Sequence, residues 1–234
     1  MTADRIRLAG PEDPYKLSDL VPTAPIDVNR TLAELEQTLS AMEDADYQRV
    51  CREMLSRHRD AFVTIPAAKS VHHSFVHGLL MHTAYMMKTA LFLAKLYGDL
   101  LDRELLLAGA FLHDFAKIRE FSLSPTGLVT DYSVAGQLLG HLVMGAEETA
   151  QVCRELNIPE EKSLLLQHMI LSHHGAPEFG AAVAPVCAES ELLSYIDMMD
   201  SRMEIYREAL EKTEPGAFSD RIFALDNKRI YRHS

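Results

Sequence analysis

The chain has 234 residues, of which 47% are hydrophobic and 24% charged, and its formal net charge is −11. This length and composition are those of an ordinary globular protein with one sizeable core. No apolar run approaches the roughly 20 residues that span a bilayer, and the polar N-terminus lacks the apolar segment of a signal peptide. We therefore expect a cytoplasmic protein with no membrane partner. The acidic charge argues against broad electrostatic capture of nucleic acid, which needs lysine and arginine.

The chain begins with a proline-rich segment and then turns helical. Residues 1–28 are expected to form a mostly irregular extension, with a short strand at residues 4–8. Thr31 and Glu34 have the spacing of a capping box, which predicts a helix from about residue 30. A second helix is predicted at residues 46–61, where apolar residues recur at helical spacing.

Helical patterns continue through most of the remaining chain. A connection that contains Pro125 and Gly127 is expected to hold at most a small hairpin, and residues 175–185 are expected to be irregular. The pattern predicts an all-α fold: an extension at 1–28, a helical domain at 29–212 and a C-terminal tail at 213–234. The further predicted helices are residues 74–97, 102–117, 134–156, 160–173 and 188–211.

Histidine is the unusual residue of this sequence. There are eleven, and nine of them lie between positions 72 and 174. His113 and Asp114 follow the apolar run LLLAGAFL, which should carry an imidazole and a carboxylate into the interior. Buried ionisable groups cost several kcal/mol unless they are paired or bind a metal. A single pair of this kind is more often a helix end that faces solvent.

The pair is not isolated, because similar residues lie in other apolar helical stretches. Each alone is more often a core or capping residue, but their recurrence on separate helices is hard to explain by chance. Imidazole and carboxylate are ligands of divalent metals, and a helical bundle can aim them at one point. The additional residues are His82, His141, His173, His174 and Asp197.

These motifs resemble those of the HD superfamily of metal-dependent phosphohydrolases in its two-metal form, whose ligand order is H, HD, H, HH, D. The segments AAKSVHHSFVHGLLMHT, HDFAKIREF, GQLLGHLVMGAEE, LLQHMILSHHGAPEFG and DMMDSRM are similar, in order, to the HD domain of the YhaM-type 3′→5′ exoribonucleases. The resemblance runs from about residue 20 to 212. It implies an HD-domain helical bundle that hydrolyses a phosphate ester in RNA.

The resemblance also implies two divalent metal ions bridged by Asp114. A water or hydroxide between two ions roughly 3.5–4 Å apart would be the nucleophile. Nitrogen and oxygen ligands suit Mn²⁺, Fe²⁺, Co²⁺, Ni²⁺ or Zn²⁺, and Mg²⁺ less well; the resemblance favours Mn²⁺. The implied ligands are His82, His113, Asp114 and Asp197 for the first ion, and Asp114, His141, His173 and His174 for the second.

Other residues are expected to contact the substrate. Lys117, one helical turn beyond Asp114, is placed to contact a phosphate oxygen, and Lys69 is expected to bind the substrate phosphate. His72 or His73 would be the general acid.

Some polar residues are expected to lie behind the ligands or away from them. His168 and Asp200 are candidates for positions behind the ligands, where Asp200 would orient a ligand histidine or pair with a basic residue. The remaining histidines are taken as structural or surface residues: His58, His77 and His233.

The substrate class stays open between three possibilities. YhaM-type enzymes resemble a two-part design with an oligonucleotide-binding barrel ahead of the HD domain, and the segment RIRLAGPEDPYKLSDLVPTAP looks like a remnant of that barrel and its linker. Such a barrel binds single strands, so without it the affinity for single-stranded RNA should fall, and the substrate would then be a short oligonucleotide or a mononucleotide.

Two other functions are alternatives to the exoribonuclease. One is a nucleotide phosphohydrolase, either a 5′-nucleotidase or a cyclic-dinucleotide phosphodiesterase, although the latter carry a GYP-type segment where this chain has GAPEFG. The other is a non-catalytic metal-binding signalling module, which an intact ligand set argues against. The amphipathic helices at residues 30–60 would serve an oligomer or cover the core.

Overall fold

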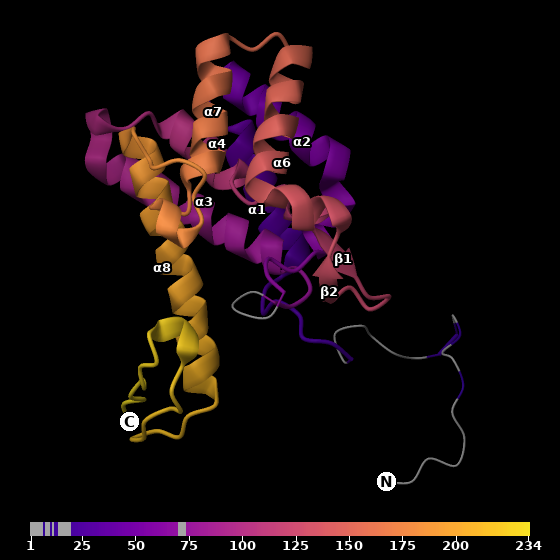
Figure 1. Cartoon of the computed structure of the whole chain (residues 1–234), viewed down its shortest axis with the longest axis vertical. Coiled ribbons are helices and arrows are strands. Elements are labelled where there is room, and N and C mark those ends of the chain that lie inside the picture. The colour runs from indigo at the N-terminus through magenta and orange to yellow at the C-terminus, as the bar shows by residue number, and fades with distance from the viewer. Residues whose placement is uncertain (1–6, 8–9, 11, 14–19, 70–73) are drawn as a thin grey trace.

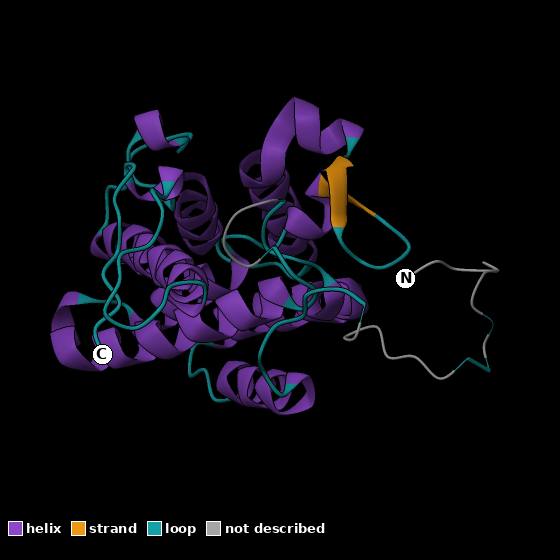
Figure 2. Ribbon diagram, turned by 90° about the horizontal axis from the view of Figure 1, so that it is seen from below, coloured by secondary structure: helices purple, strands orange, loops and turns teal. Residues whose placement is uncertain are grey.

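The computed structural model describes residues 7, 10, 12–13, 20–69 and 74–234. These residues form a bundle of helices with a small hairpin at its edge (Figures 1 and 2), which confirms the all-α prediction. The strand predicted at residues 4–8 falls almost wholly outside the described residues. In chain order the elements are α1 (Val28–Ser40), α2 (Ala45–Thr64), α3 (Gly78–Tyr97), η2 (Gly98–Leu100), α4 (Arg103–Leu112), α5 (Lys117–Glu120), β1 (Phe121–Leu123), β2 (Val129–Tyr132), α6 (Val134–Glu155), α7 (Glu160–Ser172), η3 (Pro177–Phe179), α8 (Ala188–Glu211) and η4 (Phe223–Leu225).

Helix α4 runs through the centre of the bundle. Its residues from Leu105 to Leu112 are all buried, and it contacts α2, α3, α7 and α8. A helix that is apolar on every side has to be covered on every side. The packing against α7 is close, because a Cβ atom at Gly109 would lie only 2.4 Å from the Met169 side chain. The C-terminal end of α4 therefore lies in the interior.

The helix predicted at residues 102–117 is broken in the structure. It ends at Leu112, and a turn at residues 113–116 separates it from α5. Within this turn the backbone bonds tighten to three residues, from Phe115 N–H to Leu112 O (3.1 Å) and from Lys117 N–H to Asp114 O (3.0 Å). The sequence carries no proline or glycine that would predict this break.

The predicted helix 134–156 is present as α6, but it is kinked. Gly140 has φ 70° and ψ 164°, a backbone conformation that glycine adopts without the strain a side chain would cause. Before the kink, α6 lies against α5 so closely that a Cβ atom at Gly136 would come within 2.2 Å of Glu120 O. Both glycines therefore serve the contact between α5 and α6.

Two predicted helix starts are wrong. The first helix begins at Val28, because the Asp27 side chain accepts a hydrogen bond from Arg30 N (3.0 Å) and caps it there. Thr31 and Glu34 therefore lie inside the helix and do not form a capping box. The predicted boundary at 28/29 falls within this first turn.

The third helix begins at Gly78 instead of residue 74. The segment before it pairs with the chain that precedes α1: Val76 N–H donates to Pro22 O (3.1 Å), and Ala24 N–H donates to Val76 O (2.9 Å). These bonds keep the segment extended. The small hairpin allowed by the sequence is formed by β1 and β2, which pair antiparallel with Phe121 opposite Tyr132.

Helix α8 extends beyond the rest of the bundle, and the tail folds back along it (Figure 1). Ile205 of α8 forms a small apolar cluster with Leu225 and Ile230 of the tail. The division into 1–28, 29–212 and 213–234 stays a prediction. No helix in the described part of the chain combines the length and the apolar character of a membrane span.

Candidate metal centre

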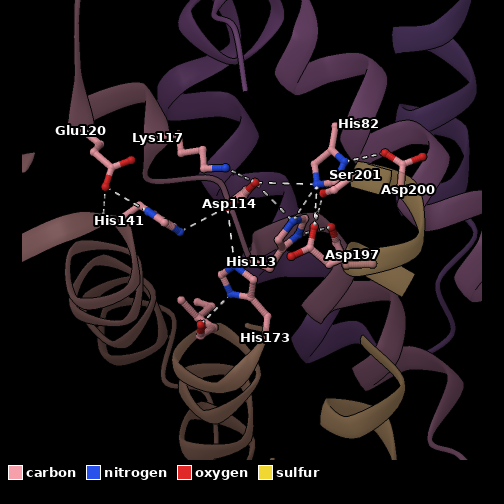
Figure 3. A network of polar contacts seen from close by, with 12 residues as sticks. His82, His113, Asp114, Lys117, Glu120, His141, His173, Asp197, Asp200 and Ser201 are labelled. Carbon is pink, nitrogen blue, oxygen red and sulfur yellow. Dashed lines mark hydrogen bonds and ion pairs between the residues drawn. The ribbon is translucent and has the colours of Figure 1, made fainter. Parts of the chain in front are cut away.

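Asp114 lies at the centre of the cluster, and its two carboxylate oxygens face different histidines (Figure 3). Oδ2 lies 3.5 Å from His113 Nε2 and 3.7 Å from His82 Nε2. Oδ1 lies 3.4 Å from His141 Nε2 and 3.6 Å from His173 Nε2. This is the arrangement that a carboxylate bridging two ions requires.

The turn after α4 and the end of α7 fix two of these imidazoles by local hydrogen bonds. His113 Nδ1 lies 3.0 Å from Ala110 O, and His173 Nδ1 lies 2.8 Å from Ile170 O. A carbonyl oxygen only accepts, so each Nδ1 carries the hydrogen and donates it. Each Nε2 is then left as a lone pair aimed at the cluster, the form in which histidine binds a metal.

Two carboxylates orient the other pair of imidazoles, so that the Nε2 atom of each faces Asp114. His82 Nδ1 lies 2.7 Å from Asp200 Oδ2, and His141 Nδ1 lies 3.0 Å from Glu120 Oε1. Glu120 Oε1 also accepts from the backbone N–H of His141 (2.9 Å), just after the kink at Gly140. Carboxylates in this position set the orientation and raise the basicity of metal-binding histidines.

Several of the converging ligand atoms have no hydrogen-bond partner. Among the described residues, five buried side-chain nitrogen or oxygen atoms lack a hydrogen-bond partner, and four of them are in this cluster. A buried polar atom without a partner costs about 1–3 kcal/mol, so four at one point fit a cation-binding site. The four are Asp114 Oδ1, His141 Nε2, His173 Nε2 and His174 Nδ1.

Three overlapping sets of side chains could each hold an ion, because the ligand atoms within each set lie no more than 4.8 Å apart. The donor set is imidazole and carboxylate with no cysteine, which fits borderline and hard divalent ions. The sets are His82–His113–Asp114, His113–His173–Asp197 and His141–His173–His174. Together they contain all seven residues predicted as ligands.

The histidines of the cluster differ in their pKa values. Burial lowers the pKa of His82, but hydrogen bonds with Asp197 and Asp200 outweigh burial and raise it to about 10. Burial lowers the pKa of His173 to about 3 and also lowers that of His174. These two imidazoles are therefore neutral at neutral pH and have lone pairs available.

The acidic groups stay ionised despite being buried. Burial raises the pKa of Asp114, but the Lys117 ammonium at 2.6 Å outweighs it and holds the pKa well below its usual range. Burial raises the pKa of Glu120 too, yet its hydrogen bonds with His141 lower the net value. The cluster thus presents negative charge to an incoming cation.

The residues predicted to contact the substrate do not share one environment in the structure. Lys117 donates to Asp114 Oδ2 (2.6 Å) and stands beside the cluster with 15% of its side chain exposed. Lys69 pairs with Asp131 of the hairpin (2.9 Å). His72 and His73 lie outside the described residues.

Of the two candidates for positions behind the ligands, only Asp200 contacts one. His168 bonds to Ser190 Oγ (3.1 Å) and accepts from Val186 N–H (3.1 Å), so it anchors the connection between α7 and α8. His58 pairs with Glu148, as a structural residue would.

Glu120 was not predicted as a site residue. It lies six residues after Asp114 among charged neighbours, and no sequence pattern distinguishes it. Its contact with His141 depends on the broken helix and on the kink at Gly140, neither of which could be read from the sequence.

A cleft of about 740 Å³ opens beside the cluster. His173, His174 and Asp197 line one part of it. The rest is lined by the connection between α7 and α8, which includes Phe179, by α8, which includes Tyr195, and by Asp226 of the tail. The volume lies within the range of small-molecule sites in proteins.

This fold and site define a class of protein. A family model described as HD domain matches residues 79–202, just over half of the chain. The chain therefore belongs to the HD-domain family. No solved structure matches it significantly.

Within this family the chain belongs with the 3′-5′ exoribonuclease YhaM proteins. It is 41% identical over 227 residues to the protein of that name from Bacillus licheniformis, which covers 97% of this chain and 71% of the relative. It is 41% identical over 229 residues to the one from Shouchella clausii, covering 98% and 70%. The Bacillus subtilis protein is 39% identical over 227 residues, covering 97% and 71%. The resemblance drawn from the motifs is confirmed.

Proposed function

We propose that this protein is a metal-dependent phosphodiesterase that removes nucleotides from the 3′ end of single-stranded RNA or short oligoribonucleotides. One observation carries the proposal: the two oxygens of Asp114 face two different pairs of histidines at 3.4–3.7 Å. The names of the relatives supply the substrate and the direction.

We assign the ligands to two sites that share Asp114. Divalent ions held there, most favourably Mn²⁺, would polarise the phosphate and activate water. The first site would use His82, His113, Asp114 and Asp197, and the second Asp114, His141, His173 and His174.

The chain's own residues prepare the site for phosphate. Asp200 and Glu120 hold two imidazoles with their Nε2 atoms facing Asp114, so little reorganisation of the rings is needed when a ligand binds. Lys117 provides a cation next to Asp114, where it could turn to a phosphate oxygen. Lys69 as a phosphate contact and His72 or His73 as general acid stay predictions, as does the cytoplasmic location.

A nucleotide phosphohydrolase is the second candidate. The cleft beside the cluster has the volume of a small-molecule site, and the net charge of −11 does not favour long nucleic acids. The two candidates differ in whether RNA or a mononucleotide is hydrolysed.

The test is release of nucleotides from a 3′-tailed single-stranded RNA in the presence of Mn²⁺. We expect 5′-mononucleotides from the wild type, loss of release after addition of a chelator, and recovery with Mn²⁺. Asp114→Ala should be inactive, while the exposed Asp60→Ala on α2 serves as the matched control. Hydrolysis of mononucleotides but not of RNA would move the assignment to the second candidate. Full activity of Asp114→Ala would refute both.

A further inference from the structure

The cleft beside the metal centre has one wall built by a single face of α8. Glu191, Tyr195, Met198 and Arg202 all line it. Their spacing of three or four residues places them along the same side of the helix. Asp197, a predicted metal ligand, lines the cleft as well, so this wall runs directly past the cluster.

The opposite wall is the connection between α7 and α8, which is held in place by its own contacts. Ala182 N–H donates to Leu171 O (2.9 Å), and Val186 N–H donates to His168. A Cβ atom at Gly175 would lie 3.7 Å from Ser194 of α8, so the two walls approach closely there. The connection is the segment between α7 and α8 in Figure 1.

Large apolar side chains stand exposed in this cleft. Phe179 is 75% exposed, Tyr195 53% and Met198 52%. The Tyr195 hydroxyl donates to Glu191 Oε1 (2.6 Å), which fixes one edge of the ring. An aromatic ring held in this way beside a phosphate-handling site is a surface on which a base can stack.

The charges of the cleft favour the end of a strand over its interior. Apart from Asp197, the charged groups that line it are two carboxylates, Glu191 and Asp226, and one guanidinium, Arg202. Arg202 is itself 3.9 Å from Asp226. A continuing strand would bring further phosphates next to these carboxylates, whereas a terminal nucleoside brings ribose hydroxyls, which donate hydrogen bonds to carboxylates.

We propose that this cleft binds the 3′-terminal nucleoside of the substrate, with its base against Tyr195, Met198 and Phe179 and its free ribose hydroxyls towards Glu191 and Asp226. This inference rests on the proposed function and deepens it by assigning the specificity for a free 3′ end. The scissile phosphate would then lie at the metal centre, and the rest of the strand would leave by another side.

The first test compares the binding of AMP with that of ribose 5-phosphate, which has no base, by titration calorimetry of the Mn²⁺-loaded protein. Stacking of a base on an aromatic side chain corresponds to a loss of roughly 5- to 150-fold on alanine substitution. Tyr195→Ala should therefore weaken the binding of AMP by about tenfold and leave the binding of ribose 5-phosphate nearly unchanged. Tyr195→Phe should retain most of the affinity. Phe92→Ala, which removes an exposed ring on α3, is the matched control.

The second test compares RNA ending in a 3′-hydroxyl with the same RNA ending in a 3′-phosphate. The cleft predicts that the 3′-phosphate slows release of the terminal nucleotide by about tenfold or more, because it would face two carboxylates. Equal rates would overturn the assignment, as would equal binding of AMP and ribose 5-phosphate or an equal loss of both in Tyr195→Ala. Any of these three results, with RNA still degraded by the wild type, leaves the proposed function standing. A base-dependent affinity for AMP without hydrolysis of RNA would instead refute the proposed function and leave the cleft as a nucleotide site.

Discussion

Glu120→Gln tests whether this carboxylate acts through His141. The ionised Glu120 accepts two hydrogen bonds from His141, one from the backbone N–H (2.9 Å) and one from Nδ1 (3.0 Å). Glutamine keeps one acceptor oxygen of similar shape but removes the charge. Glu120→Ala removes both bonds.

The expected losses follow from these contacts. Partners that orient a metal-binding histidine typically contribute about 10- to 100-fold to metal affinity. We expect roughly tenfold weaker Mn²⁺ binding for Glu120→Gln and roughly 100-fold for Glu120→Ala. Because a hydrogen bond to a charged group contributes about 1.5–3 kcal/mol, Glu120→Ala should also lower the free energy of unfolding of the metal-free protein by about 2 kcal/mol or more.

Isothermal titration with Mn²⁺ and denaturant unfolding of the metal-free protein measure the two effects separately. Glu148→Gln is the matched control, because Glu148 is a partly buried carboxylate of α6 that pairs with His58 and Arg119, outside the cluster. RNA hydrolysis by Glu120→Gln should fall at limiting Mn²⁺ and recover at saturating Mn²⁺. The reasoning is refuted if Glu120→Ala binds Mn²⁺ as tightly as the wild type and only its unfolding changes.

Two further substitutions test neighbouring contacts. Asp200→Asn keeps an acceptor for His82 Nδ1 but loses the charge, so the affinity for Mn²⁺ should fall about tenfold. An unchanged affinity, measured by calorimetry, would show that Asp200 does not contribute to metal binding. Gly136→Ala would place a Cβ atom 2.2 Å from Glu120 O and force α5 and α6 apart. We expect a loss of about 1–3 kcal/mol in the free energy of unfolding together with weaker Mn²⁺ binding, and wild-type values for both would show that the helices separate at no cost.

The candidate ligands could be named from the sequence because they sit in apolar stretches, where a buried ionisable side chain is costly unless it is paired or binds a metal. The seven predicted ligands come together in the structure, and most helices lie within a few residues of their predicted bounds. Helical periodicity is a local property, so the sequence alone was enough for the helices, and the resemblance to the HD superfamily supplied the expected roles of the seven residues. What stays a prediction is that these residues bind metal, the substrate roles of Lys69, Lys117, His72 and His73, and the division into domains.

The tertiary structure decided what surrounds the ligands. His82 and Asp200 are 118 positions apart, and His141 and Glu120 are 21 apart. The break after Leu112 also has no local signal. Such contacts depend on the packing of α4, α5 and α6. The local conformational preference of a short segment does not specify which distant segments it will contact.

The cleft also depends on tertiary contacts. Tyr195 reads in the sequence as one of several aromatic residues on a helix, and Asp226 as part of a polar tail. Only the return of the tail along α8 and the anchoring of the connection after α7 bring them to one cavity beside the histidines. The sequence by itself determined which atoms could bind a metal, because that depends on residue type and local burial. The tertiary structure decided what those atoms face, because that depends on contacts between segments far apart in the chain.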